Sequence, residues 1–335
     1  MSATILQPTP ALTAMRRVAL IYNPASGQSS GGRAGRIAQA IAVLEKAGVE
    51  VQAIATHSPA SAAAQAQQAV REGCDTILAC GGDGTVHETL QGLVGQSAAL
   101  GVIPMGTANA LASDLGISFS AAKAAKVLLE ATPVRVSVGR VFYRDSDGNQ
   151  RSRYFIVAAG VGVDAHFFSR LDSRLKRRFG YAAYLAEALR LWATHTFPTF
   201  SASVVESGSG HARTEEVSQL LAVRISNFGG LVQKLAPGAS ISNSNLHVIA
   251  IKTRSRLRYL RFMAAVMLRR HTFGKTIELI DTVRVECSEL AGSAARTFVE
   301  ADGELLGGLP VRIEIVPQAL TLLIPPKALS RITRR

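Results

Sequence analysis

The sequence predicts an α/β domain built on a parallel sheet, followed by a mainly β domain. In the first part of the chain, short apolar runs typical of buried strands alternate with segments whose apolar residues recur at helical spacing. Strands that alternate with helices favour a parallel sheet covered on both faces. After Pro133 helical segments become rare and strand patterns dominate. We therefore place a domain boundary at about residue 138.

The first domain is expected to hold four strands and three helices. Asn23-Pro24 ends the first strand, Gly48 is a suitable cap for the first helix, and Ser58-Pro59 precedes the second helix. The expected strands are 18–22, 49–55, 76–80 and 100–103, and the helices are 34–47, 60–71 and one from about residue 86.

The second domain is expected to consist mostly of strands. Asp145 to Asn149 has the composition of a turn and separates the first two of them. The expected strands are 134–143, 153–159, 199–206, 217–226, 246–252, 276–286, 296–300, 311–316 and 320–324. Pro325-Pro326 ends the last strand.

The net charge of +13 is the unusual bulk property, with 37 Lys and Arg against 24 Asp and Glu. Such a field attracts polyanions, among them nucleic acid, anionic lipid headgroups and nucleotide polyphosphates. No apolar run approaches the roughly 20 residues that cross a bilayer. Cys74, Cys80 and Cys287 are scattered and odd in number, which favours reduced thiols in a cytoplasmic protein.

Three glycine-rich polar turns follow predicted strands of the first domain. They are 23–27 (Asn-Pro-Ala-Ser-Gly), 81–85 (Gly-Gly-Asp-Gly-Thr) and 104–109 (Pro-Met-Gly-Thr-Ala-Asn). Ligands of open parallel sheets bind where neighbouring strands end. Glycines let the backbone approach a phosphate, and the next helix offers N–H groups to the anion. Asp83 would repel a bare phosphate, so it indicates a bridging Mg²⁺.

Any one of these turns alone would more often be structural, but three in one domain favour a phosphate site. A Walker A lysine pattern is absent, and the first strand is not followed by a Gly-x-Gly-x-x-Gly turn. The predicted phosphate site is therefore of another type.

At these turns the sequence resembles the diacylglycerol kinase catalytic-domain family, in particular bacterial lipid kinases and the related sphingosine and ceramide kinases. The middle motif is shared with NAD kinases and phosphofructokinases, whereas all three in this order are specific. Segments 159–165, 235–239 and 302–304 extend the resemblance into the second domain. It implies a Rossmann-like α/β ATP-binding domain (1–137), a β-sandwich lipid-substrate domain (138–316) and a C-terminal segment (317–335) that returns to the first domain.

The resemblance also implies the site residues. Those that would bind ATP are Asn23, Ser26, Gly27, Thr56, Gly81, Gly82, Asp83, Gly84, Thr85, Gly106, Thr107 and Asn109. Asp83 would also hold the catalytic Mg²⁺. Glu304 would accept the proton of the substrate hydroxyl, with Asp302 in support, and a carboxylate is a suitable general base. The alternative is that Asp302-Gly303 is simply a hairpin turn.

Two positions depart from the family pattern. Asn243 and Ser244 stand where the family usually has an Asp-Gly pair whose carboxylate helps to hold a structural metal. Amide oxygens bind Mg²⁺ or Ca²⁺ more weakly, so a second metal site is left open. His87 resembles the sphingosine kinases, which keeps a long-chain base or ceramide open as the substrate.

Two basic stretches predict a membrane surface as partner. Residues 252–270 hold seven basic residues and no acidic one, and residues 170–178 hold five against one Asp. Basic amphipathic segments bind anionic headgroups, although both stretches could instead be ordinary solvated faces. Nucleic acid is not expected, because aromatic residues are sparse among the basic ones and no DNA-binding motif is present.

These observations favour a cytoplasmic, ATP- and Mg²⁺-dependent lipid kinase, peripherally associated with the inner face of the membrane. Its expected substrate is diacylglycerol or a similar lipid alcohol. A sphingoid-base or ceramide kinase is the alternative enzyme, and a catalytically silent nucleotide- or membrane-binding regulator is the alternative of another class. The oligomeric state stays open, with a homodimer as one possibility.

Overall fold

The computed structural model describes residues 15–24, 30–58, 60–163, 196–206, 212–229, 235–292 and 297–333. The chain packs into two units. The first contains residues 1–138, 227–229 and 317–335, and the second contains 139–226 and 230–316.

A parallel sheet forms the centre of the first unit. Its strands β1 (Arg17–Tyr22), β2 (Glu50–Ala55), β3 (Thr76–Gly81) and β4 (Ala99–Pro104) lie in the order β2-β1-β3-β4. The end of β14 (Glu304–Ile324) adds a parallel strand beside β4 through Thr321 and Leu322. Every residue of β3 and β4 is buried, which explains their uninterrupted apolar sequences. The predicted α/β fold is confirmed.

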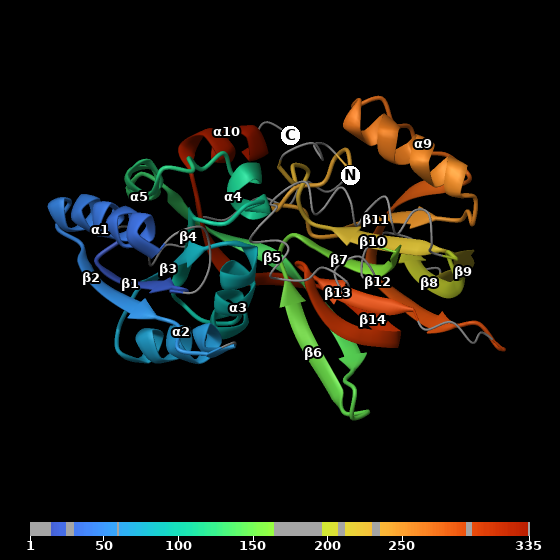
Figure 1. Ribbon diagram of the computed structural model, residues 1–335, viewed down its shortest axis with the longest axis horizontal. Coiled ribbons are helices and arrows are strands. Elements are labelled where there is room, and N and C mark those ends of the chain that lie inside the picture. Colours follow the sequence, from blue (N-terminus) through green and yellow to red (C-terminus); the bar gives the residue numbers. More distant parts are fainter. Residues whose placement is uncertain are drawn as a thin grey trace. The chain divides into compact units, whose positions relative to one another are not determined.

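Helices cover both faces of this sheet (Figure 1). Helix α1 (Ser30–Lys46) packs with α5 (Ala121–Leu129), and α2 (Ser61–Arg71) packs with α3 (Asp83–Leu93) on the opposite face. A Cβ at Gly92 of α3 would lie 2.2 Å from the carbonyl oxygen of Ala63 in α2. Glycine is therefore required for this close helix contact. Two short helices complete the unit, α4 (Ala110–Asp114) and α10 (Pro326–Thr333).

Helix α3 begins three residues earlier than its apolar pattern predicts, at Asp83 instead of Val86. Gly82 is the N-cap, and the backbone N–H groups of Thr85 and Val86 both donate to its carbonyl oxygen. The glycine-rich turn is thus itself the first turn of the helix, where N–H groups lack helical partners.

The second unit is an antiparallel β-sandwich, as predicted. Its strands pair in the order β13-β7-β10-β11-β12-β8-β9, β14 pairs with both β13 and β12, and β5 and β6 form a hairpin. Their bounds are β5 (Thr132–Arg144), β6 (Gln150–Phe155), β7 (Ala158–Gly162), β8 (Phe200–Glu206), β9 (Ala212–Val217), β10 (Gln219–Val223), β11 (Leu246–Ile251), β12 (Ile277–Glu289) and β13 (Phe298–Ala301). Inward residues such as Phe155, Val161, Phe200 and Val285 form a common core.

Four expected strands differ in the structure. The expected strand 153–159 is two strands, because β6 ends at Phe155 and the next three backbone N–H groups donate to the carboxylate of Asp302. The expected strand 217–226 is likewise divided, between β9 and β10. Conversely, 311–316 and 320–324 belong to one continuous strand, β14. The basic stretch 252–270 contains a helix, α9 (Arg256–Met267).

Candidate active site

The strand register brings four predicted site segments to one edge of the parallel sheet. Tyr22 at the end of β1 is opposite Ala55 of β2 and Cys80 of β3, and Gly81 is opposite Pro104 of β4. The residues that follow these strand ends include Asn23, Thr56, Gly82 and Gly106. Ser26 and Gly27 lie outside the described residues.

This edge contains the switch point of the sheet. The chain passes from β1 to β2 on one side and then to β3 on the other side of β1. In open parallel sheets, ligands bind in the crevice at the carboxyl ends of the strands where the order reverses. Asn23 and the turn at Gly81–Thr85 flank that point.

Two of the glycine-rich turns are in backbone contact. A Cβ added at Gly106 would lie 2.5 Å from the Cα of Gly82, and one added at Gly81 would lie 2.3 Å from the Oγ1 of Thr85. Both distances are shorter than side-chain atoms tolerate. Gly106 is therefore needed for the two turns to pack together, and Gly81 for the side chain of Thr85 to fold back within its own turn. Gly82 and Gly106 are partly exposed, so their backbones are open to a ligand.

The carboxylate of Asp83 joins the same two turns. Its two oxygens accept hydrogen bonds from the backbone N–H groups of Asn109 (2.9 Å) and Ala110 (2.7 Å). The Asn109 side chain, which is buried, bonds both the N–H (2.9 Å) and the carbonyl (2.7 Å) of Gly106. Asn109 has a left-handed backbone, with φ of 48°, which asparagine tolerates better than most residues. Thr107, between them, is exposed.

A second set of carboxylates lies on a hairpin of the other unit. Strands β13 and β14 pair through Ala301 and Glu304, so Asp302 and Gly303 form the two-residue turn, with φ of 48° and 85°. Positive φ at both positions is typical of the tight hairpin turn that Asp-Gly favours. The motif therefore forms a hairpin turn, which agrees with either role for its carboxylates, and the hairpin leaves Glu304 exposed at the start of β14.

The Asp302 carboxylate is fixed by three hydrogen bonds. The N–H of Ile156 donates to Oδ2 (3.0 Å), and the N–H groups of Val157 (2.9 Å) and Ala158 (3.0 Å) donate to Oδ1. The N–H of Asp302 in turn donates to the carbonyl of Ala158 at 2.8 Å. This carboxylate therefore orients the turn that carries Glu304.

Comparison with known proteins identifies the family. Residues 17–141 match the model of the diacylglycerol kinase catalytic domain, and residues 156–324 match the model of the YegS C-terminal NAD kinase beta sandwich-like domain. The chain belongs to the diacylglycerol kinase family. It is therefore a kinase-family enzyme, as the three motifs predicted.

Relatives of this family match most of the chain. A diacylglycerol kinase of Bacillus subtilis is 28% identical over 88% of this chain and 92% of its own length. One from Staphylococcus saprophyticus is 25% identical, with 92% of this chain and 96% of its own covered.

Solved structures share the fold. A diacylglycerol kinase structure from Bacillus anthracis superposes with a TM-score of 0.70 at 20% identity, covering 94% of this chain and 98% of its own. Yeast NADH kinase superposes with a TM-score of 0.54 at 11% identity, covering 98% of this chain and 89% of its own.

The donor set of this diacylglycerol kinase-family site fits Mg²⁺ only together with a nucleotide. Among the described residues, no group of three or more His, Cys, Asp and Glu side chains gathers as a metal cage. Asp83 provides a single, anchored carboxylate. Mg²⁺ is commonly held by one or two carboxylates plus substrate phosphates and waters, so Asp83 fits that role.

Two arginines at this edge were missed by the sequence analysis. Nη2 of Arg36 donates to the carbonyls of Pro104 (3.1 Å) and Phe119 (2.9 Å), and Nη1 of Arg33 donates to those of Asn23 (3.4 Å) and Pro24. Burial raises the pKa of the Cys80 thiol to about 12, and the charges of Arg36 and Arg33 oppose that rise. Their spacing in the first turns of the helix after the Asn-Pro-Ala-Ser-Gly turn is the signal that could have found them.

Glu300 was also missed, although it lies only two residues before Asp302. The residue is 3% exposed, and its Oε2 accepts the N–H of Gly303 at 2.8 Å. A second acidic side chain thus supports the same turn. His87, the position shared with sphingosine kinases, is buried within α3.

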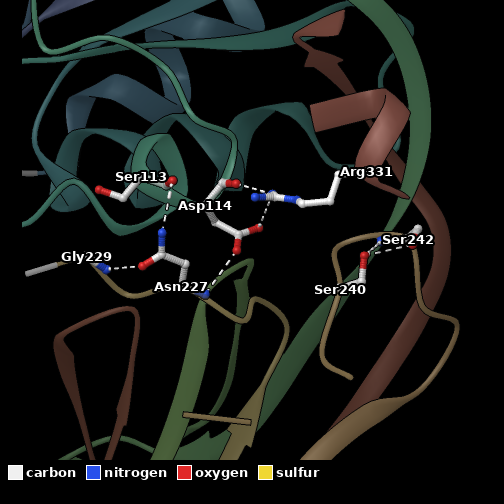
Figure 2. Close-up of polar contacts among 7 residues, drawn as sticks. All are labelled: Ser113, Asp114, Asn227, Gly229, Ser240, Ser242 and Arg331. Carbon is white, nitrogen blue, oxygen red and sulfur yellow. Dashed lines mark hydrogen bonds and ion pairs between the residues drawn. The ribbon is translucent and has the colours of Figure 1, made fainter. Parts of the chain in front are cut away.

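Helix α4, which follows the Pro104–Asn109 turn, is held by distant parts of the chain (Figure 2). The N–H of Asn227 donates to Oδ1 of Asp114 (3.0 Å), and Arg331 bonds the Asp114 carbonyl. The Asn227 side chain contacts both Ser113 (3.4 Å) and the N–H of Gly229 (3.0 Å). These contacts restrict the helix whose first residues bind Asp83.

Proposed function

We propose that this protein transfers the γ-phosphate of ATP to the hydroxyl of diacylglycerol or a similar membrane lipid. The observation that supports this most is the joining of the Gly81–Thr85 and Pro104–Asn109 turns by Asp83 and by the contact between Gly82 and Gly106. Relatives named diacylglycerol kinase support the lipid.

Residues of the first unit bind the nucleotide. The Gly82 and Gly106 backbones and the N–H groups that begin α3 bind the phosphates, since a helix N-terminus attracts anions. Arg33 and Arg36 contribute the positive charge that a lysine supplies in other phosphate-binding loops. Asp83 would hold Mg²⁺, and an ion bound there would neutralise charge on the transferred phosphoryl group.

The hairpin between β13 and β14 activates the lipid hydroxyl that accepts the phosphate. Glu304 accepts the proton of the lipid hydroxyl as that oxygen attacks the γ-phosphorus, and the bond from the γ-phosphorus to the bridging oxygen breaks to release ADP. Asp302 does not react itself. Its bonds to residues 156–158 and the Glu300 bond to Gly303 restrict the turn, which positions the Glu304 carboxylate. Positioning of this kind supplies much of the rate gain in phosphoryl transfer.

Helix α9 is proposed to bind the membrane. One apolar face of this region is buried, through Phe262 and Val266. Another is exposed, with Leu257 at 63% and Leu268 at 69%. This exposed set also includes Leu260 and Met267. Exposed arginines flank these apolar residues: Arg254, Arg256, Arg258, Arg261, Arg269 and Arg270. Figure 1 shows α9 (orange) outside the strands of the second unit.

Among the described residues, no helix combines the length and apolar character that spanning a membrane requires. The other basic stretch, 170–178, lies outside the described residues.

The function is tested with ATP, Mg²⁺ and mixed micelles of diacylglycerol, monoacylglycerol, sphingosine or ceramide. We expect phosphate transfer to diacylglycerol, and transfer greatly reduced in Asp83→Asn. Asp147→Asn, in the exposed β5–β6 turn, is the matched control and should keep full activity. Transfer to sphingosine or ceramide alone would favour the alternative that His87 suggests. ATP binding without transfer to any lipid would favour a regulator.

Neutralising Arg254, Arg256 and Arg258 to glutamine should weaken binding to phosphatidylserine-containing vesicles. Each lost charge removes about 1 kcal/mol of attraction to an anionic surface, so roughly 100-fold weaker partitioning is expected. Vesicle co-sedimentation measures it, and ATP affinity should stay unchanged. Lys46, Lys123 and Lys126 changed to glutamine remove the same charge from the first unit, as a control. Equal loss in both triple variants would indicate a general charge effect and not a docking helix.

A further inference from the structure

Arg224 is buried completely at the end of β10, with 0% of its surface exposed. Its guanidinium donates to three backbone carbonyls of one loop. Nη2 bonds the carbonyl oxygens of Ile241 (3.1 Å) and Asn243 (2.8 Å), and Nη1 bonds that of Asn245 (2.5 Å). The three carbonyls, from alternate residues, thus all face one positive group.

Convergent backbone carbonyls are a common part of Ca²⁺ and Mg²⁺ sites, where a carboxylate usually completes the ligand set. This loop is the one in which the family resemblance implies a structural metal. Here the carbonyls already face a cation of the chain itself. A metal ion among them would be repelled by the guanidinium, because two cations would share one set of oxygens.

The side chain of Asn243, which stands where the family has a carboxylate, is also unsuited to a metal. Its Nδ2 donates to the carbonyl of Gly238 (3.0 Å) and lies 2.6 Å from Nε2 of His247. A carboxylate at this position could not donate either bond. The amide nitrogen is therefore used within the protein, and the donor set does not fit a metal.

We propose that Arg224 replaces a structural metal in the loop at residues 240–245, so that this part of the sandwich folds without any divalent ion. The protonation states of Arg224 and of its neighbour His247 agree with this role. Burial lowers the pKa of Arg224 to about 9, which leaves it protonated at neutral pH. Burial also lowers the pKa of His247, against the opposing effect of Asp281, whose carboxylate lies 2.7 Å from Nδ1. A neutral His247 adds no second positive charge.

The first test uses the full-length wild-type protein without nucleotide. After gel filtration, elemental analysis should find far less than one divalent metal per chain, and Tm should be the same with EDTA as with Mg²⁺ or Ca²⁺. About one retained metal per chain, together with a fall of Tm in EDTA, would overturn the proposal. Omitting nucleotide separates this loop from any Mg²⁺ that accompanies ATP, so the result does not depend on the proposed reaction.

The second test replaces the guanidinium of Arg224. Arg224→Met should lower Tm strongly, and Arg224→Lys should restore only part of the loss, because one ammonium group lacks the planar fork that bonds three carbonyls. Arg224→Met combined with Asn243→Asp removes the guanidinium and adds a carboxylate, so Tm should now rise with Mg²⁺ or Ca²⁺. Arg284→Met, an exposed arginine of β12, is the control and should leave Tm nearly unchanged. An unchanged Tm in Arg224→Met would contradict the proposal.

Discussion

Changing Glu304 to glutamine is expected to lower kcat with the lipid substrate by about 100- to 10,000-fold, the usual contribution of a general base. The affinity for ATP should stay normal, since the nucleotide contacts belong to the first unit. Glutamine has nearly the same size and keeps the exposed position at the start of β14, but its amide cannot accept the hydroxyl proton. Steady-state kinetics in mixed micelles measure kcat, and calorimetry measures ATP binding.

The control for this change is Glu289→Gln, which removes the same charge from an exposed residue at the end of β12. It should keep wild-type turnover. Near-normal turnover in Glu304→Gln would remove Glu304 as the base. A pH–rate profile adds a second readout, because loss of a general base should also remove the acidic limb of kcat.

The second large effect is expected at Gly106. An alanine there would place its Cβ 2.5 Å from the Cα of Gly82 and 2.9 Å from Oδ1 of Asn109. Neither neighbour can rotate away, since one is backbone and the other is held by two hydrogen bonds. The turns must separate, which costs about 1–3 kcal/mol, as overpacking does. Loss of that free energy from nucleotide binding lowers the affinity for ATP roughly 5- to 150-fold.

Titration calorimetry with ATP and thermal unfolding together measure this effect. Gly35→Ala is the matched control, because a Cβ there meets no atom within 4 Å and Gly35 lies in helix α1. Alanine favours a helix over glycine by about 1 kcal/mol, so this control should bind ATP normally and be slightly more stable. Wild-type ATP affinity in Gly106→Ala would show that the two turns do not bind the phosphates as a unit.

The local features of the fold could be predicted because their signals are local. Apolar runs and turn residues placed the parallel strands of the first unit, and Asp302-Gly303 indicated the hairpin that the structure contains. The division of 153–159 into β6 and β7 could not be predicted. Its cause is the carboxylate of Asp302, which is more than 140 residues away in sequence.

The same limit applies to the site. The residue types and spacing of the three glycine-rich turns indicated a phosphate site, and their resemblance to known motifs identified the family and its class of chemistry. Arg33 and Arg36 were missed because their bonds go to backbone carbonyls of the strand ends and of the segment before α5. Backbone acceptors have no sequence signature, so the only available signal was the spacing of the two arginines after the first glycine-rich turn. Arg224 was missed for that reason too, since the carbonyl oxygens of Ile241, Asn243 and Asn245 accept from its guanidinium.

The sequence by itself thus determined the kinase family, the α/β and β-sandwich architecture and the turns expected to bind phosphate. Periodicity indicated the strands and helices, and the resemblance of the glycine-rich turns to known motifs indicated the family and the sandwich. Only the tertiary structure decided which backbone groups the charged side chains bind. It assigned Asp83 to the start of α4, Asp302 to the bend before β7 and Arg224 to the loop before β11. Such partners depend on strand register and side-chain reach between distant residues, which composition and spacing do not encode.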